Sequence, residues 1–378
     1  MAVTEIRAQG ILRRFHRIDS WFVARSGLNL SRGCSHDCAY CDGRAEKYRV
    51  EGEFGSDIAV KVNAVEVLAR ELVPKRRSTA PRWSGFVVLG GGVGDSYQPV
   101  EAHYGLARKC LELFETLGVP VHVLTKSTLV LRDADILARM AEGGRPRVLV
   151  SFSLSSADDD VSAVFEPGVP PPSERLAAIR ALTERGIPAG VFLLPVIPFV
   201  TDSPEMIGAT LTAASAAGAR YVLFGGMTLK EGRQKEHFLS ALSRVRPELV
   251  PRCRELYTGD QWGRAAGGYY ARLARMFGRL ACEHGVLPRI PRALFDGLLR
   301  EGDLPVVLLD QVHAMLEMLG EPTRYGYAAF QLSRGAAPGS VRLDSAAARL
   351  VEEIGRTGTA GLYEDLLSRF SPGAAAAR

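Results

Sequence analysis

Short β-rich runs alternate with helical stretches between about residues 26 and 226, and this alternation constrains the fold more than any other sequence feature. It is typical of parallel βα units. The expected strands are Gly27–Ser31, Gly85–Gly90, Val119–Thr125, Val148–Leu154, Ala189–Pro195 and Arg220–Phe224. The expected helices between them are Val60–Leu72, Val100–Leu117, Ala134–Ala141, Glu174–Arg185 and Pro204–Ala217. Six parallel strands with outer helices predict an α/β fold, a partial (β/α)6 TIM-type barrel rather than a full eight-stranded one.

The sequence predicts three regions: an N-terminal arm over residues 1–25, the partial barrel over 26–230, and a helical C-terminal extension over 231–378. Helical periodicity in Tyr269–Cys282 and Val306–Leu319 supports the extension. The composition, 47% hydrophobic and 24% charged residues, is that of an ordinary soluble protein. No apolar run approaches the ~18–20 residues that span a bilayer, so no membrane association is expected. The first residues lack the apolar segment of a secretory signal, which favours a cytoplasmic location.

A cysteine motif follows the first expected strand. Cys34, Cys38 and Cys41 are spaced C-x3-C-x2-C, and Tyr40 precedes the last of them. Three thiolates on one tight loop suit a [4Fe–4S] cluster that leaves one iron without a protein ligand. An iron of this kind can bind a small molecule and pass it an electron.

Two other interpretations of these cysteines are weaker. Structural zinc usually takes four ligands, commonly as two C-x2-C pairs, and the sequence has no second pair. His36 could be a fourth ligand, but it lies inside the same short loop, where it would strain a tetrahedral site. A disulfide is not expected in a reducing compartment. The cluster is therefore favoured over zinc and over cysteines that bind nothing.

Polar residues follow the next expected strands, where the active sites of such barrels lie. In the segment Gly90-Gly91-Gly92-Val93-Gly94-Asp95-Ser96-Tyr97, glycines would let the backbone approach a ligand and Asp95 would offer a carboxylate to a cation. A plain tight turn explains this segment equally well. Lys126 could bind a carboxylate or lie on the surface. Ser151, Ser153 and Ser155 share one face of a strand, as ligand-binding or core hydroxyls.

The motifs together resemble the radical S-adenosylmethionine (SAM) superfamily, in its spore photoproduct lyase-like branch, whose members are often labelled DNA repair photolyases. The resemblance covers roughly residues 20–290. It is carried by Asn29-Leu30-Ser31-Arg32-Gly33-Cys34-Ser35-His36-Asp37-Cys38-Ala39-Tyr40-Cys41-Asp42, Gly94-Asp95-Ser96-Tyr97-Gln98-Pro99-Val100-Glu101, Leu124-Thr125-Lys126-Ser127, Phe165-Glu166-Pro167-Gly168, Glu174-Arg175-Leu176, Leu193-Leu194-Pro195-Val196-Ile197-Pro198 and Tyr257-Thr258-Gly259-Asp260-Gln261-Trp262-Gly263-Arg264.

This resemblance implies a radical SAM barrel that binds two cofactors, a [4Fe–4S] cluster and SAM. Cys34, Cys38 and Cys41 would be the metal ligands. The residues expected around SAM are Tyr40, Gly91, Gly92, Asp95, Ser96, Lys126, Ser153 and Ser155. Reductive cleavage of SAM would yield a 5′-deoxyadenosyl radical that abstracts hydrogen from a substrate. An electron donor such as flavodoxin or ferredoxin would supply the electron.

Two observations bear on the substrate. The clusters Arg13-Arg14-Phe15-His16-Arg17 and Lys75-Arg76-Arg77, with Arg82-Trp83, mix cations with aromatic rings as nucleic-acid sites do, although solvated surface is the commoner explanation. The lyase has a cysteine just before its Ser-Asp pair, but Val93-Gly94 precedes Asp95 here, and this departure puts reversal of a thymine dimer in doubt but not the radical chemistry. A nucleic acid is the favoured substrate. A peptide or small metabolite, or a non-catalytic protein that binds the cluster and SAM, are the alternatives.

Overall fold

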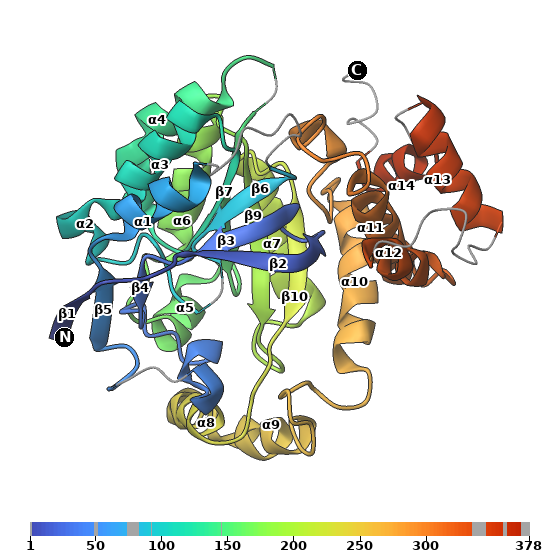
Figure 1. The fold of residues 1–378 in the computed structure, drawn as a ribbon. Helices are drawn as coiled ribbons and strands as arrows, with labels where there is room; N and C mark the ends of the chain where they lie inside the picture. The colour runs from blue at the N-terminus through green and yellow to red at the C-terminus, as the bar shows by residue number, and fades with distance from the viewer. Residues whose placement is uncertain are drawn as a thin grey trace.

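The computed structural model describes residues 2–48, 52–73, 83–91, 93–144, 146–334, 345–357 and 361–371. At its centre a seven-stranded sheet curls into a half-barrel with helices outside it (Figure 1). The strand order is β10-β9-β8-β7-β6-β3-β2. The strands are β2 (Leu12–Asp19), β3 (Ala24–Leu28), β6 (Phe86–Leu89), β7 (Val121–Thr125), β8 (Val148–Leu154), β9 (Ala189–Val196) and β10 (Val222–Gly226). All neighbours from β3 to β10 are parallel, which confirms the partial (β/α)6 barrel.

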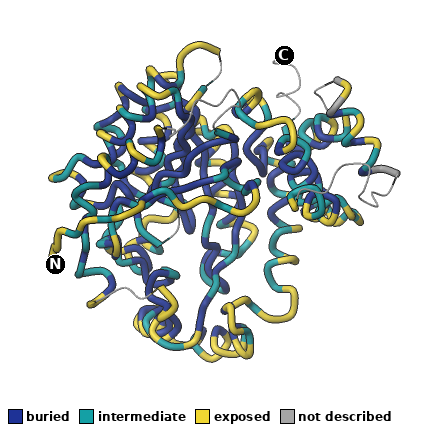
Figure 2. Tube along the Cα trace, viewed as in Figure 1, coloured by how far each residue is buried: buried dark blue, intermediate teal, exposed yellow. Residues whose placement is uncertain are grey.

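Helices cover the outer face of these strands, and Figure 2 shows the buried residues concentrated in the sheet between them. Every residue of β8 is buried, as expected for a parallel strand covered on both faces. The elements of this layer are α1 (Ala64–Leu72), α2 (Glu101–Tyr104), α3 (Leu106–Leu117), η3 (Thr128–Asp133), α4 (Ala134–Ala141), α5 (Asp159–Phe165), α6 (Pro172–Thr183) and α7 (Pro204–Ala216).

A second, three-stranded sheet was not expected from the sequence. It contains β1 (Ala2–Ile6), β4 (Ser31–Arg32) and β5 (Asp57–Lys61), in the order β1-β5-β4. The predicted strand Gly27–Ser31 is therefore wrong at its end, because the first barrel strand stops at Leu28 and Ser31 pairs with β5 instead. The predicted helix Val60–Leu72 begins only at Ala64, because Val60 pairs with Glu5 of β1.

The helix predicted over Val100–Leu117 is also interrupted. Gly105 has a φ of 61°, a left-handed conformation that favours glycine, and it separates α2 from α3. Two backbone N–H groups at the start of α3, those of Leu106 and Ala107, donate to the Glu101 carboxylate at 3.0 and 2.8 Å. Glu101 thus caps a helix that starts without an ordinary N-cap side chain.

A polar network crosses the interior of the half-barrel. The His122 imidazole contacts the Ser151 hydroxyl through Nε2 at 2.8 Å and the Phe22 carbonyl through Nδ1 at 3.2 Å. Ser151 in turn contacts the Tyr221 hydroxyl at 2.8 Å. Burial lowers the pKa of His122 to about 4, so this imidazole is neutral at physiological pH. Ser151 is a core hydroxyl.

The residues after β10 pack on two different sides of the half-barrel. The helices α8 (Arg233–Val245) and α9 (Val250–Leu256), joined by η4 (Pro247–Leu249), share an apolar cluster with Cys38, Ala39 and Tyr40. The remaining helices lie beside the sheet (Figure 1). They are α10 (Tyr269–Glu283), η5 (Arg292–Leu294), α11 (Leu304–Leu319), α12 (Tyr325–Ser333), α13 (Ser345–Thr357) and α14 (Gly361–Phe370).

Polar contacts attach this second group of helices to the barrel. Asp303 forms an ion pair with Arg25 of β3, and it also accepts a hydrogen bond from the Ser84 hydroxyl. The Gly85 N–H donates to the Leu298 carbonyl at 2.9 Å, just before β6. Within the described residues, no helix has both the length and the apolar character needed to cross a bilayer.

Candidate functional site

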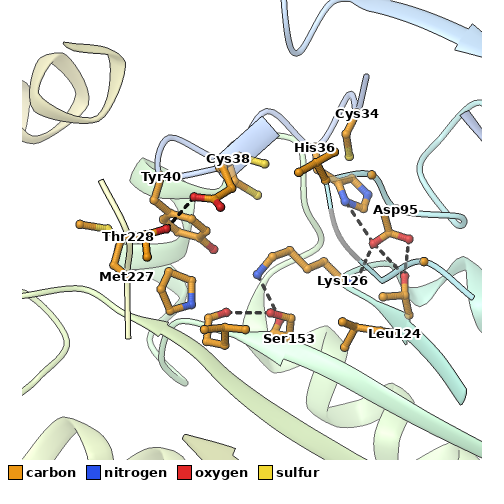
Figure 3. Close-up of a pocket in the computed structure, with 18 of the residues that line it drawn as sticks. Cys34, His36, Cys38, Tyr40, Asp95, Leu124, Lys126, Ser153, Met227 and Thr228 are labelled. Carbon is orange, nitrogen blue, oxygen red and sulfur yellow. Dashed lines mark hydrogen bonds and ion pairs between the residues drawn. The ribbon is translucent and has the colours of Figure 1, made fainter. Parts of the chain in front are cut away.

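A cavity of about 410 Å³ lies at the carboxyl ends of the parallel strands. The loop between β4 and η1 (Asp42–Arg44) forms one wall, and the ends of successive strands form the others. The lining includes Cys34, His36, Cys38, Tyr40, Cys41, Asp42, Gly90, Asp95, Lys126, Ser153, Leu194, Gly226, Met227 and Thr228. Figure 3 shows most of these side chains converging on one space. The barrel topology therefore brings together residues that are as much as 206 positions apart, from Phe22 to Thr228.

All three motif cysteines line this cavity as free thiols. Cys34 and Cys38 are buried and Cys41 is half-buried. The loop is tightly turned: Gly33 has a φ of 76°, and a Cβ there would lie 2.4 Å from the Asp57 carbonyl oxygen. Burial raises the pKa of Cys34 to about 12 and raises the pKa of the other two thiols as well. Binding to iron would therefore release protons from these thiols.

The turn after α5 is hydrogen-bonded to the cysteine loop. The Ala39 N–H donates to the Phe165 carbonyl at 2.8 Å, and the Gly168 N–H donates to the His36 carbonyl at 3.2 Å. A Cβ on Gly168 would lie 2.3 Å from the Ser35 carbonyl oxygen, so only glycine fits there. The segment Phe165-Glu166-Pro167-Gly168 therefore packs directly against the cysteine loop.

The segment after β10 holds the other end of the loop. Asp42 forms an ion pair with Lys230 at 2.7 Å and accepts a hydrogen bond from the Thr228 hydroxyl at 2.7 Å. The Gln234 amide donates to the Tyr40 carbonyl at 3.0 Å and to Asp42 at 3.1 Å. The start of α8 thus fixes the residues on both sides of Cys41.

Asp95 is held in place by several donors. It accepts hydrogen bonds from the Thr125 hydroxyl at 2.8 Å, the Lys126 N–H at 2.7 Å and the Tyr97 N–H at 2.8 Å. Its second oxygen lies 3.4 Å from Nδ1 of His36. Asp95 therefore links the ends of two strands to the cysteine loop, as the dashed lines in Figure 3 show.

Lys126 projects into the same cavity but is already paired. Its ammonium group lies 2.9 Å from Glu166, 3.4 Å from the Ser153 carbonyl and 5.5 Å from the centre of the Tyr40 ring. Three N–H donors are available on an ammonium group, so one remains for a ligand. Figure 3 shows this group between Tyr40 and Ser153.

Glu166 is the centre of a buried charge network that sequence reasoning missed. It is completely buried and pairs with both Lys126 and Arg175, and it also accepts hydrogen bonds from Tyr40 and Ser162. Burial alone would raise the pKa of Glu166, but Lys126 and Arg175 outweigh it and hold the pKa well below its usual range. Glu166 and Arg175 each belong to one of the motifs that carry the resemblance, but only the fold shows that the two side chains form an ion pair.

Of the other described residues expected around a cofactor, one lines the cavity and the rest do not. Ser153 lines the cavity, but its hydroxyl donates to the Leu194 carbonyl at 2.7 Å. Ser96 and Ser155 are buried outside the cavity lining, and their hydroxyls have no partner among the described residues. Gly91 also lies outside the lining, whereas Gly92 lies outside the described residues, as do the basic residues at 75–77 and 82.

The donor set fits a [4Fe–4S] cluster, because three thiols from one loop face one cavity. Within the described ranges, no three His, Cys, Asp or Glu side chains are grouped so as to hold a single metal ion. Ligation of a cluster differs, since each thiolate binds a different iron. The cavity also suits a polar small molecule: Nε2 of His36 is buried at its wall and has no partner among the described residues.

Comparisons with known proteins agree with this geometry. The family model of the radical SAM superfamily matches residues 28–211. An uncharacterised protein of Mycobacterium tuberculosis (strain H37Rv) is 37% identical over 237 residues, which cover 62% of this chain and 67% of the relative. A protein of Pseudomonas phage M6 described as a radical SAM Nalpha-GlyT isomerase is 24% identical over 232 residues, 61% of this chain and 45% of the relative. Among solved structures, spore photoproduct lyase has a similar fold, with a TM-score of 0.55 and 18% identity over 75% of this chain and 79% of the lyase.

Proposed function

Since the chain belongs to the radical SAM superfamily, we propose that it is an enzyme that generates a substrate radical at the cavity described above. The observation that carries this proposal is that three thiols of one loop face the same cavity as Asp95 and Lys126. A [4Fe–4S] cluster and SAM, when bound there, would supply a 5′-deoxyadenosyl radical that abstracts hydrogen. A reductant such as flavodoxin or ferredoxin would deliver the electron.

In this proposal the chain positions the two cofactors and excludes water. Cys34, Cys38 and Cys41 would bind iron. The free donor of the Lys126 ammonium would meet the carboxylate of SAM, while the ion pair with Glu166 holds that ammonium in place. Asp95 already accepts three close hydrogen bonds. We therefore assign two roles to it: it positions His36 and the Lys126 backbone, and it would bind the amino group of SAM.

We further propose a nucleic acid as the substrate, because exposed aromatic rings and a cation lie beside the lining of the cavity, where the Tyr48 hydroxyl donates to Asp42 at 3.4 Å. Trp262 is 53% exposed and Tyr48 is 36% exposed. The Lys47 ammonium lies between them, 4.7 Å from the centre of the Tyr48 ring and 5.7 Å from that of Trp262. Exposed rings beside cations are how proteins stack single-stranded bases and attract their phosphates.

The position of Trp262 ties it to the cavity. The Gly263 carbonyl accepts a hydrogen bond from the Leu229 N–H at 2.7 Å, and Leu229 directly follows Met227 and Thr228 of the cavity wall. Spore photoproduct lyase, whose fold is similar, has been solved with a dinucleoside photoproduct bound. For this chain the proposed substrate class rests on Lys47, Tyr48 and Trp262.

The first experiment tests radical generation. After anaerobic reconstitution with iron and sulfide, the protein should bind iron and release 5′-deoxyadenosine from SAM when dithionite is added. Cys38→Ala should abolish both. Cys282→Ala removes a half-buried thiol of α10 outside the cavity and should change neither. Deoxyadenosine release by Cys38→Ala at the wild-type rate, or stoichiometric zinc in place of iron, would contradict the proposal.

A second experiment tests the substrate class without turnover. A fluorescent single-stranded oligonucleotide should bind with an affinity that falls as salt increases, because bound phosphates release counterions. Trp262→Ala should weaken binding at least about fivefold, the lower end of what one stacking platform contributes. Leu117→Ala, on the surface of α3, is the control. An affinity that does not change with salt would exclude a nucleic acid.

A further inference from the structure

A second, larger groove lies away from the cavity, between strand β2 and helices α11 and α12. Its volume is about 720 Å³. Residues 13–21 line one side of it, and the other side includes Val306, Asp310, His313, Ala329 and Phe330. This groove contains the cluster Arg13-Arg14-Phe15-His16-Arg17, which the proposed reaction does not use.

The groove contains three arginines and two carboxylates, Asp19 and Asp310. Arg13, Arg14 and Arg17 are exposed, and none of them forms an ion pair among the described residues. The two carboxylates of the groove form no ion pair with these arginines and accept hydrogen bonds from neutral donors instead. Asp19 accepts the N–H groups of Trp21 and Phe22 at 2.8 and 3.2 Å, and Asp310 accepts the Ser20 hydroxyl at 2.8 Å. The unpaired guanidinium groups are therefore available to an anion.

Aromatic rings stand beside these cations. The Arg17 guanidinium lies 4.9 Å from the centre of the Phe330 ring, and that of Arg334 lies 5.7 Å from the same ring. Phe330 is 39% exposed and Tyr327, one helical turn earlier on α12, is 62% exposed. Phenyl rings and guanidinium planes are both surfaces on which unpaired bases stack.

The strand pairing connects the groove to the cavity side of the sheet. Leu12 pairs with Leu28 and Arg13 with Gly27, so Arg13 lies near the carboxyl end of β3. The Leu28 carbonyl accepts the N–H of Gly90, which lines the cavity. The strand then runs toward the opposite edge, where Asp19 pairs with Ala24. An extended ligand bound along β2 would therefore run away from the edge of the sheet that carries the cavity.

We infer that this groove binds a single-stranded nucleic acid, with its phosphates on Arg13, Arg14 and Arg17 and its bases against Phe330 of the groove and the exposed Tyr327 beside it. The inference rests on the proposed function, since the bound segment would flank the nucleotide that enters the cavity. Arginine suits this role because its planar fork binds phosphate through two parallel hydrogen bonds.

The test measures anisotropy of a labelled 12-nucleotide oligothymidylate over a salt series. The double variant Arg13→Gln/Arg14→Gln should reduce the slope of log affinity against log salt by about 1.4, because each phosphate contact to a single strand contributes about 0.7. Phe330→Ala should weaken binding at least about fivefold. Arg180→Gln, at an exposed arginine of α6, should leave affinity and slope unchanged. Thermal unfolding of each variant shows that the fold is kept.

The outcomes separate this inference from the proposed function. If the oligonucleotide binds and Trp262→Ala weakens it, but the groove variants match the wild type, the groove inference is overturned and the proposed function stands. If no oligonucleotide binds at all, both substrate proposals fail, while deoxyadenosine release still reports on the radical chemistry. Equal affinity for poly-glutamate, or for anionic vesicles, would overturn the inference in favour of an acidic protein or a membrane surface. Deoxyadenosine formation without nucleic acid should be the same in all groove variants.

Discussion

Replacing Glu166 by Gln should destabilise the protein more than any conservative change on its surface. The substitution keeps the size of the side chain and removes its charge, which leaves the cations of Lys126 and Arg175 without their shared partner. The Arg175 side chain is fully buried and that of Lys126 is only 14% exposed, so water cannot compensate. Removal of one partner from a buried ion pair costs about 3–5 kcal/mol.

The lower end of that range is expected here. Arg175 would still donate to the Ser153 carbonyl at 2.6 Å and to the Ser162 hydroxyl at 2.9 Å. A loss of about 3 kcal/mol corresponds to a fall in Tm of about 6 °C, at the roughly 2 °C per kcal/mol found for larger domains. Differential scanning calorimetry of the apoprotein measures it. Because the Glu166 pKa is depressed in the folded protein, its contribution is present above the ordinary carboxyl pKa and is lost as the pH falls below it.

Two further variants make this reasoning refutable. Glu174→Gln changes an exposed carboxylate eight residues away and should shift stability by no more than about 0.5 kcal/mol. Lys126→Met should partly rescue Glu166→Gln, because the double variant removes the uncompensated ammonium as well. A coupling free energy between the two sites of about 0.5–3 kcal/mol is expected for residues in contact. Wild-type stability of Glu166→Gln, or strict additivity in the double variant, would show that these buried charges do not stabilise one another.

Three other predictions concern different parts of the molecule. Gly168→Ala should lower the iron bound after reconstitution, because its Cβ would lie 2.3 Å from the Ser35 carbonyl oxygen, whereas Gly302→Ala, with open space around it, should not. The free energy of unfolding should fall by about 3 kcal/mol between pH 6.5 and 4. The reason is that His122 has a pKa of about 4 in the folded protein, whereas in the unfolded chain it is protonated already below about 6.5. His122→Gln should flatten this part of the pH profile measured by urea denaturation. Asp303→Asn should cost about 1.5–3 kcal/mol in the same assay, because Arg25 loses its charged hydrogen-bond partner. A pH profile unchanged by His122→Gln, or wild-type stability of Asp303→Asn, would contradict these expectations.

Local sequence patterns predicted those elements that depend mainly on their own periodicity. Val148–Leu154 and Ala134–Ala141 have the predicted boundaries, because a continuous apolar run and a regular apolar stripe are properties of neighbouring residues. The strand Asp57–Lys61 was missed, because it depends on pairing with Ala2–Ile6, more than 50 positions away. Patterning within a short window carries no information about such a partner.

The same distinction applies to the candidate site. The spacing of the cysteines and their place after a strand predicted the loop that faces the cavity, and the fold places Lys126 and Ser153 beside it. The role of Glu166 could not be predicted, because its partners Tyr40, Lys126 and Arg175 come from three separate segments. The motifs that contain Glu166 and Arg175 were the available signal in the sequence, and a motif does not name the partner of a side chain.

The contact between Asp42 and Lys230 has a consequence for how the protein is made. These residues are 188 positions apart, and Gln234, which also binds the loop, follows Asp42 by 192 positions. At about 5–20 residues per second, the ribosome would add that length in roughly 10–40 s. For most of this interval the cysteines have left the ribosome, but the segment that fixes Tyr40 and Asp42 has not been made. Iron delivered during translation would therefore meet an unsupported loop, and the cysteine loop reaches its final form only once synthesis has passed the start of α8.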